Sequence, residues 1–324
     1  MRSTKPRVIE LFAGAGLFGH AFQESGFRLV RAVELDAVAA STYAANLGNH
    51  IEVADVRTVK PTGACEVLIA GPPCQGFSTL GLRNADDPRN DLSLEVVKWA
   101  RVLTPRVIVI ENVAAFLRSA TWPRLERRLR RLGYDVTAIE LDAMNYGVAQ
   151  TRRRSFTIAS INGKLPSLPK PHSRRFTVED AWDALPSKPD GHNQHYAPTP
   201  SKIARARMRL IPPGGDKRDV MRRAPKLAPP SWFRLACEVT DAWGRMEWDK
   251  ASNTLRTSLQ NASKGRYIHP EQDRVISLRE AARLHSIPDS FAFEGLPTQI
   301  ARQIGNSVPP GLGRVVAREV LKIL

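Results

Sequence analysis

The chain has 324 residues, of which 42% are hydrophobic and 25% are charged. This fits one large or two ordinary globular domains and excludes disordered, collagen-like and coiled-coil proteins. Its 48 Lys and Arg against 32 Asp and Glu give a net charge of +16, which attracts polyanions such as nucleic acid, although charge alone also fits a basic surface without a specific ligand.

The N-terminus passes from a short basic leader directly into a strand-like run, and no later stretch reaches about 18 apolar residues. Only 3 Cys occur, with no pair at metal-ligand spacing, so neither a disulfide framework nor a metal site is expected. We therefore expect a soluble, cytoplasmic protein, associated with the nucleoid if it is bacterial.

Short apolar runs alternate with helical patterns through the first half of the chain. Nearly continuous Val and Ile runs, such as VIVIE, are typical of strands that are covered on both faces. The alternation predicts a doubly wound α/β domain with a parallel sheet. The expected strands are residues 7–12, 28–34, 51–54, 66–70, 106–111 and 155–161.

A helix with one buried face is predicted between the last two of these strands, from the spacing of its apolar residues. The apolar residues are Trp122, Leu125, Leu129 and Leu132. Four arginines are expected on the opposite, solvated face, namely Arg127, Arg128, Arg130 and Arg131.

From about Leu165 the sequence pattern changes. Pro, Gly and basic residues replace the regular spacing of apolar residues that is typical of strands and helices. This predicts a smaller, loop-rich second domain. Helical patterning returns at SLREAARLHSIPDSF, and the chain ends in a predicted helix, GLGRVVAREVLKIL, that packs on the first domain. The expected boundaries are 1–165 for the first domain, 166–276 for the second, 277–303 for a hinge and return segment, and 304–324 for a segment that completes the first domain.

The first strand runs into a glycine-rich turn, Phe12-Ala13-Gly14-Ala15-Gly16, and Glu34 follows at the end of the second strand. Such a turn lets a backbone approach a ligand closely, and a carboxylate at this spacing can hold two ribose hydroxyls. A nucleoside cofactor is therefore implied, either NAD or S-adenosyl-L-methionine. Asp55, after the third strand, is a candidate partner of an adenine amino group or a loop cap.

The fourth strand ends in Gly71-Pro72-Pro73-Cys74. Ligands of an open α/β sheet bind outside the carboxyl ends of its strands, so Cys74 is predicted to face the same crevice as the glycine turn. The two prolines fix the backbone and remove amide donors. This setting favours a nucleophilic thiol over an inert core cysteine.

The fifth strand delivers Glu111 to the same edge of the sheet, where it is a candidate general acid or, equally, a capping or ion-paired residue. In the segment 150–154, alternation along an extended chain predicts Arg152 and Arg154 on one face. Two guanidiniums suit a phosphate and a carbonyl oxygen, or the Glu111 carboxylate. A plain basic loop is the alternative.

In this order, the residues resemble the DNA cytosine-5 methyltransferases over essentially the whole chain. The motifs that carry the resemblance are FAGAG at 12–16, Glu34, Asp55, GPPC at 71–74, ENV at 111–113, QxRxR at 150–154, RExxRL at 279–284 and GNSVP at 305–309. The resemblance implies a Rossmann-like methyltransferase domain, a smaller target-recognition domain, and double-stranded DNA as the substrate. Glu10 stands where this family commonly has an aspartate.

The resemblance also implies a mechanism. The Cys74 thiolate would add to C6 of a flipped-out cytosine, while Glu111 would protonate or hydrogen-bond N3. Arg154 would hold the cytosine O2, and Arg152 would position Glu111 and a backbone phosphate.

The cofactor implied is S-adenosyl-L-methionine. The residues implied to bind it are Phe12, Gly14, Gly16, Glu34, Asp55, Pro73, Asn306 and Ser307. The residues implied to contact DNA are Gln75, Ser78, Arg152, Thr254 and Leu255. We expect a monomer in a restriction-modification or epigenetic role, with a cognate restriction endonuclease as a further partner and no contact with a membrane.

Three alternatives stay open at this point. A tRNA methyltransferase of the same fold would act on a different substrate, but that branch of the family differs in the segment after Pro72-Pro73-Cys74-Gln75. An NAD-dependent oxidoreductase would accept the glycine turn and Glu34, but it would leave Cys74 and Glu111 without a role. A non-catalytic DNA-binding module would be expected to have lost one of those two residues.

Overall fold

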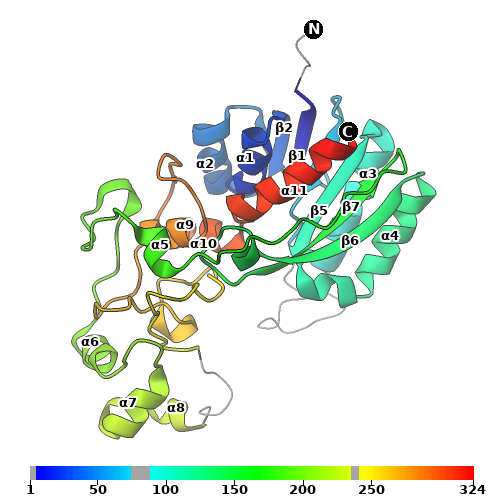
Figure 1. Cartoon of the computed structure of the whole chain (residues 1–324). Helices are drawn as coiled ribbons and strands as arrows, with labels where there is room; N and C mark the ends of the chain where they lie inside the picture. The colour runs from blue at the N-terminus through cyan, green and yellow to red at the C-terminus, as the bar shows by residue number, and fades with distance from the viewer. Residues whose placement is uncertain (1–4, 74–87, 235–240) are drawn as a thin grey trace. The chain divides into compact units, whose positions relative to one another are not determined.

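The computed structural model describes residues 5–73, 88–234 and 241–324. The chain divides into two compact units (Figure 1). The first comprises Met1–Tyr146, Arg153–Pro171 and Ser307–Leu324, and the second comprises Gly147–Arg152 and His172–Asn306. The first unit thus runs a few residues beyond the expected end at 165, and a short piece between its last two strands belongs to the second unit.

The first unit is built on a seven-stranded sheet with the order β3-β2-β1-β4-β5-β7-β6. Its strands are β1 (Arg7–Leu11), β2 (Arg28–Glu34), β3 (Ile51–Val53), β4 (Val67–Ala70), β5 (Val107–Val113), β6 (Asp135–Asp142) and β7 (Arg153–Ser160). The first five strands pair in parallel, as predicted. The prediction is wrong at the other end of the sheet, where β7 is antiparallel to both β5 and β6.

Strand β6 was not expected from the sequence. It lies at the edge of the sheet, and only Val136 and Leu141 of its side chains are buried. An edge strand that is covered only in part does not need the continuous apolar run by which the central strands were found.

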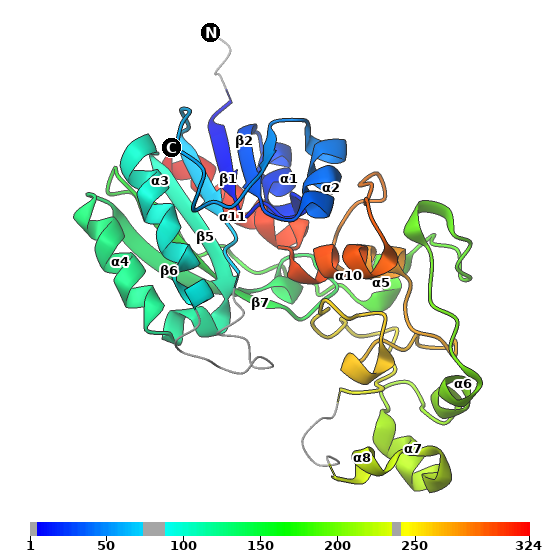
Figure 2. The same ribbon diagram turned by 180° about the vertical axis from the view of Figure 1, so that it is seen from behind.

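Helices cover both faces of this sheet. Figure 1 shows α1 (Leu17–Glu24), α2 (Ala37–Leu47) and α11 (Pro310–Ile323) on one face, and Figure 2 shows α3 (Glu95–Leu103) and α4 (Thr121–Arg131) on the other. The predicted helix with an arginine face is confirmed as α4, because Leu125 and Leu129 are fully buried while the four arginines are exposed. The C-terminal helix α11 packs on α1, as expected.

The core on the α3 and α4 face joins strand residues to both helices. Ile9, Leu68 and Ile108 from the central strands belong to one buried cluster with Trp99 of α3 and Leu125 of α4. This packing fixes the central strands in a rigid frame.

The second unit consists of short helices and many loops, as its content of Pro, Gly and basic residues predicted. Its α-helices are α5 (Val178–Trp182), α6 (Lys202–Arg209), α7 (Lys217–Arg223), α8 (Pro230–Arg234), α9 (Leu278–Leu284) and α10 (Pro297–Asn306). Within the described part of this unit, β-pairing is limited to isolated bridges such as that between Gln150 and Ser252.

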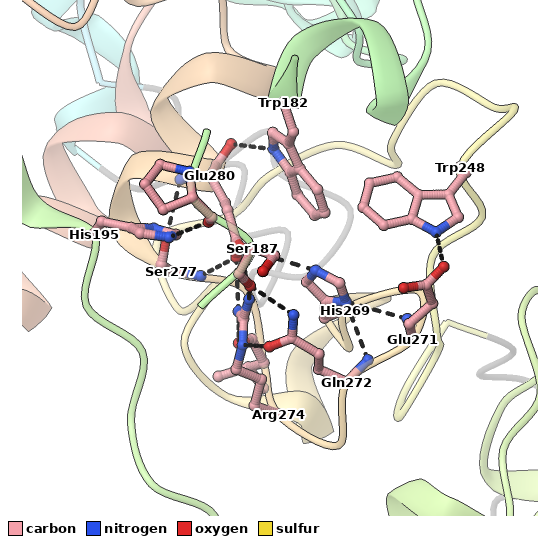
Figure 3. A network of polar contacts seen from close by, with 12 residues as sticks. Trp182, Ser187, His195, Trp248, His269, Glu271, Gln272, Arg274, Ser277 and Glu280 are labelled. Carbon is pink, nitrogen blue, oxygen red and sulfur yellow. Dashed lines mark hydrogen bonds and ion pairs between the residues drawn. The ribbon is translucent and has the colours of Figure 1, made fainter. Parts of the chain in front are cut away.

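A buried polar network stabilises this unit around the start of α9 (Figure 3). The Glu280 carboxylate accepts from Arg274 at 2.7 and 2.8 Å and from the Ser277 main-chain N–H at 2.6 Å, and it forms a capping box with Ser277. His269 stacks on Trp182 with the ring centres 5.3 Å apart. The Glu280 of the predicted RExxRL motif therefore has a structural role here.

In the ranges of the chain that the structure describes, no helix is long and apolar enough to cross a membrane.

Candidate active site

The glycine turn after β1 is held by the carboxylate at the end of β2. The Gly14 main-chain N–H donates to Glu34 Oε2 at 2.7 Å, and the Asp36 N–H donates to Glu34 Oε1 at 2.8 Å. Gly14 and Gly16 have φ values of 55° and 85°, in the left-handed region that favours glycine. The predicted Gly14, Gly16 and Glu34 are thus brought together at the carboxyl edge of the sheet.

The two glycines of the turn differ in what surrounds them. A Cβ on Gly16 would lie 2.6 Å from side-chain carbons of Tyr43 and Leu47, so this position has no room for a larger residue. A Cβ on Gly14 would meet no atom within 4 Å, so the described structure leaves open space beside this backbone. The backbone at Gly14 is therefore accessible for close approach by a ligand.

Phe12 and Asp55 end the first and third strands on the same edge. Phe12 is half-buried with a φ of 55°. Arg57 donates to both carboxylate oxygens of Asp55, and these hydrogen bonds hold the pKa of Asp55 below its usual value. Asp55 is therefore an ionised acceptor at the end of β3, paired with a largely exposed arginine.

A carboxyl group is buried beneath the glycine turn. Glu10 of β1 is 2% exposed, and its Oε1 accepts from the Gly19 N–H in α1 at 3.0 Å. Its Oε2 has no hydrogen-bond partner among the described residues, and a Cβ on Gly19 would lie 2.2 Å from it. Burial raises the pKa of Glu10 to about 8.

The end of β5 meets the loop that leads to Cys74. Glu111 Oε1 lies 2.9 Å from Arg154 Nε, and both side chains are largely buried. A Cβ on Gly71 would be 3.8 Å from Glu111 Oε2, so this carboxylate lies beside the start of the GPPC turn. Asn112 Nδ2 donates to the Pro72 carbonyl at 3.5 Å and links the same two strands.

The predicted arginine pair is divided between the two units. Arg154, which we expected to hold the cytosine O2, forms the ion pair with Glu111. Arg152 is 1% exposed, and it donates to the main-chain carbonyls of Leu255 at 3.0 Å and Gly305 at 2.7 Å. Arg152 was expected to position Glu111 and a backbone phosphate, and the bonds described here anchor it within the second unit.

The segment around Thr254 is joined to the one around Gln150. Thr254 Oγ1 donates to the Thr151 carbonyl at 2.7 Å, and the Leu255 N–H donates to Gln150 Oε1 at 3.1 Å. Leu255 is fully buried, so its side chain does not reach a ligand as we expected, and its backbone serves as the anchor of this segment. Thr254 is half-buried.

The GNSVP motif spans the boundary between the units. Gly305 is the next-to-last residue of α10 in the second unit, where an added Cβ would lie 2.5 Å from the Thr257 main-chain nitrogen. Asn306 is exposed and Ser307, the first residue of the returning segment, is half-buried. The glycine is therefore required for close packing against the 256–257 backbone.

Three predicted residues, Cys74, Gln75 and Ser78, lie outside the described residues. Pro73 is the last described residue before them and is half-buried. Cys65 is described and differs from a reactive thiol, because burial raises its pKa to about 12.

Sequence reasoning missed the contributions of Asn112, Gln150 and Glu10. The amide of Asn112 binds the Pro72 carbonyl, and Gln150 Nε2 lies 2.9 Å from His285 Nδ1. Both amides act through contacts that are distant along the chain, so no local pattern reveals them. The burial of Glu10 was signalled by its place inside an apolar strand, which the sequence did show.

The residues of the first unit fit a nucleoside cofactor. The open space beside Gly14 gives room for close approach of a ligand to the backbone, and Glu34 is fixed by two main-chain N–H groups at the end of β2. Asp55 provides a second acceptor just after β3, the strand that lies beside β2 in the sheet. This arrangement is the one expected for ribose and base recognition at the carboxyl ends of parallel strands.

Comparisons with known proteins identify the family of the chain. The model of the C-5 cytosine-specific DNA methylase family matches residues 6–322. The Type II methyltransferase M1.HphI of Haemophilus parahaemolyticus is 33% identical, over 97% of this chain and 86% of its own. M.XorII of Xanthomonas oryzae pv. oryzae is 32% identical, over 99% of this chain and 86% of its own.

Solved structures share the fold. A mutant of Spodoptera frugiperda DNMT2 superposes with a TM-score of 0.69 at 19% identity, covering 98% of this chain and 99% of the other. The chain thus has a seven-stranded α/β sheet with the candidate catalytic Glu111 near the end of β5. Its sequence also matches the family model over nearly its whole length. The chain belongs to the C-5 cytosine-specific DNA methylases.

Proposed function

We propose that this protein transfers a methyl group from S-adenosyl-L-methionine to C5 of a cytosine in a specific duplex DNA sequence, as the modification enzyme of a restriction-modification system. The observation that carries the proposal is the position of the Glu111–Arg154 ion pair beside Gly71, where the GPPC turn begins. The named relatives, which are Type II methyltransferases, support the biological setting.

Cytosine C5 is too weak a nucleophile to take a methyl group directly, so the ring must first be activated. The Cys74 thiolate forms a bond to C6, and the displaced electron pair moves toward C5 and N3. Glu111 donates a proton or a hydrogen bond at N3, which stabilises the charge that develops there. S-adenosyl-L-methionine supplies the methyl group that C5 receives.

The last step restores the thiolate. A base removes the C5 proton, the electron pair of that C–H bond re-forms the C5–C6 double bond, and the bond from C6 to the Cys74 sulfur breaks. Cys74 therefore leaves with the electron pair that it brought, and Glu111 regains the proton that it donated at N3. The enzyme is regenerated without an external oxidant or reductant.

Arg154 also takes the role of positioning Glu111, which the sequence analysis gave to Arg152. Its Nε lies 2.9 Å from Glu111 Oε1, so it fixes the orientation of the carboxyl group from which the N3 proton comes. A guanidinium has five N–H donors, so Arg154 can hold Glu111 and also reach the cytosine O2. Arg152 acts instead as a buried link between the segments that carry Leu255 and Gly305.

The cofactor residues follow the edge of the sheet. We assign Phe12 to stacking on the adenine, Glu34 to the ribose hydroxyls and Asp55 to the adenine amino group. Gly14, Gly16 and Pro73 shape the backbone around the cofactor, and Asn306 and Ser307 lie toward the methionine end. The Glu34 assignment is supported by its two main-chain donors, which orient its carboxylate at the end of β2.

The target base must leave the helix for this chemistry, because C5 and C6 are inaccessible in a stacked duplex. Base flipping costs a few kcal/mol, which contacts with DNA must offset. We assign these contacts to Thr254 and the basic second unit, and to Gln75 and Ser78, which follow Cys74 in the sequence. A monomer acting in the cytoplasm, with a cognate restriction endonuclease, completes the proposal.

Replacement of Cys74 tests the covalent step, and the chain offers a matched control in Cys65. Cys74→Ala is expected to abolish methyl transfer to DNA, while affinity for S-adenosyl-L-methionine and for DNA stays within about twofold, because only the nucleophile is lost. Cys65→Ala should retain transfer, since burial raises the pKa of that thiol to about 12. Full turnover by Cys74→Ala would overturn the mechanism.

A further inference from the structure

A hollow with a volume of about 200 Å³ opens on the second unit, and its lining carries charges of both signs. It is lined by Asp241, Asn253, Thr254, Arg256, Arg266 and Tyr267, among others. A second hollow of about 210 Å³ shares Asp241, Asn253 and Arg266 with the first. All of these lining residues belong to the second unit.

Hydrogen bonds orient the polar groups of the hollow. Asn253 Nδ2 donates to Asp241 Oδ1 at 3.1 Å. Arg266 Nη1 donates to the main-chain carbonyls of Gly215 at 2.8 Å and Arg245 at 2.9 Å, which fixes this guanidinium as part of the wall. The carboxylate of Asp241 is half-buried and therefore still faces the solvent in part.

Arg256 is held from two sides. Its Nη1 donates to the Lys264 carbonyl at 3.0 Å, and its main-chain N–H donates to the Tyr267 hydroxyl at 3.1 Å. The side chain is half-buried, and a guanidinium has four further N–H donors beyond the one bond that Nη1 makes here. Arg256 is therefore a preorganised donor in the lining of a hollow that also presents the Asp241 carboxylate as an acceptor.

The carboxylate decides which part of DNA this hollow can take. A phosphate offers only acceptors and a negative charge, so it could pair with Arg256 or Arg266 but would leave the Asp241 carboxylate without a donor and beside a like charge. A base edge in the major groove offers donors and acceptors together. In a protein with a net charge of +16, an oriented carboxylate among arginines at this position is thus suited to a base pair and not to the backbone.

We propose that this hollow reads a C·G base pair, with Asp241 accepting a hydrogen bond from the cytosine N4 amino group and Arg256 donating to O6 and N7 of the paired guanine. These are the pairings that the geometry of the two base edges favours. Asn253 acts as a positioning residue that orients the carboxylate. The assignment rests on the proposed action on duplex DNA, and it adds the residues that select the sequence.

Selection of duplexes from a randomised pool by the full-length protein tests the assignment without requiring turnover. Wild type is expected to enrich a short sequence that contains a C·G pair. Asp241→Asn should lose the preference at that one position by about 5- to 150-fold, which corresponds to the 1–3 kcal/mol of a good base contact. Arg256→Lys keeps the positive charge but loses the paired N–H donors of the guanidinium, so it should lose preference at the same position.

Asp249→Asn is the matched control, because Asp249 is an exposed acid of the same unit that does not line either hollow. Its enriched sequence should equal that of wild type. Unchanged preference in both Asp241→Asn and Arg256→Lys, with folding verified by circular dichroism, would overturn the assignment. So would a wild type that enriches no sequence.

The same variants separate this inference from the proposed function. If wild type methylates DNA and Asp241→Asn keeps the full sequence preference, the reading of the hollow is wrong and the methyltransferase function stands. If wild type methylates no DNA but enriches a sequence in an Asp241-dependent manner, the hollow is a reading site and the proposed reaction is wrong.

Discussion

The buried carboxyl group of Glu10, below the glycine turn, makes the stability of the fold depend on pH. It lies on β1 directly below the turn, and its only described hydrogen bond comes from the Gly19 N–H. Gly19 is required here, because a Cβ would lie 2.2 Å from Glu10 Oε2. Burial is the largest cause of its raised pKa, and the negative charge of Glu34 adds to it.

Replacement of Glu10 should therefore change how stability depends on pH. The pKa of Glu10 is about 8 in the folded protein and 4.5 without burial, so its neutral form stabilises the fold below pH 4.5, and this contribution is lost as the pH rises through 8. Between pH 6.5 and 8 the loss amounts to about 2 kcal/mol. Urea unfolding of wild type should show this decline and Glu10→Gln should not.

The chosen pH window separates Glu10 from other groups. Burial lowers the pKa of His269 to about 4, so its neutral form stabilises the fold above pH 6.5 and its effect is lost only as the pH falls toward 4. The buried thiol of Cys65 has a pKa of about 12, so it affects stability only above pH 9. An equal decline in Glu10→Gln would assign the pH dependence to another group.

At the scale of elements, the C-terminal helix completes the first unit through a close crossing with α1. Gly313 of α11 lies where a Cβ would be 2.7 Å from Ala21 Cβ and 3.4 Å from Phe18 Cδ2. Arg314 pairs with Glu24 beside this crossing at 2.7 Å. The helix that follows the GNSVP motif is thus fixed against the helix that follows the glycine turn, so both ends of the chain support one site.

Gly313→Ala should destabilise the protein although alanine is the better helix former. In an open helix this change would stabilise by about 1 kcal/mol, but here the added methyl group forces α1 and α11 apart at a cost of roughly 1–3 kcal/mol. Thermal unfolding should show a lower Tm. Ala21→Gly in the same chain should restore part of the loss, and a double mutant no more stable than expected from additivity would refute the crossing.

How far the sequence predicted these elements depended on whether a signal was local. The parallel strands, the glycine turn and Glu34 follow from short apolar runs and from residues next to their ends, and all were found. Strand β6 was missed because an edge strand has only two buried side chains. Alternation of side chains predicted Arg152 and Arg154 on one face, but it could not show that Arg154 contacts Glu111. That contact depends on the antiparallel pairing of β7 with β5.

The candidate site was predictable to the same extent. The strand ends specified which residues meet at the edge of the sheet, so Glu111 and Gly71 are neighbours as expected. The burial of Leu255 and Arg152 was not predictable, because it arises from contacts with residues about 100 and 150 positions away along the chain. Long-range packing leaves no periodic signal in the sequence.

For the whole molecule, the charge of +16 predicts a strong effect of salt on DNA binding. A protein that neutralises several phosphates releases their counterions, and six to ten such contacts lower the affinity by about 10³–10⁵-fold between 50 and 200 mM salt. We expect the equilibrium constant for DNA to fall by at least about 10²-fold over this range. Affinity for S-adenosyl-L-methionine is the internal control and should change little, whereas a flat response for DNA would exclude a phosphate-dominated surface.

The measurement that tests the central claim most directly is transfer of labelled methyl from S-adenosyl-L-methionine to unmethylated duplex DNA, with tRNA in a parallel reaction and bisulfite sequencing of the DNA. The account predicts label in DNA, at C5 of cytosine within one short repeated sequence, and none in tRNA. Label in tRNA alone, or in neither nucleic acid, would contradict it.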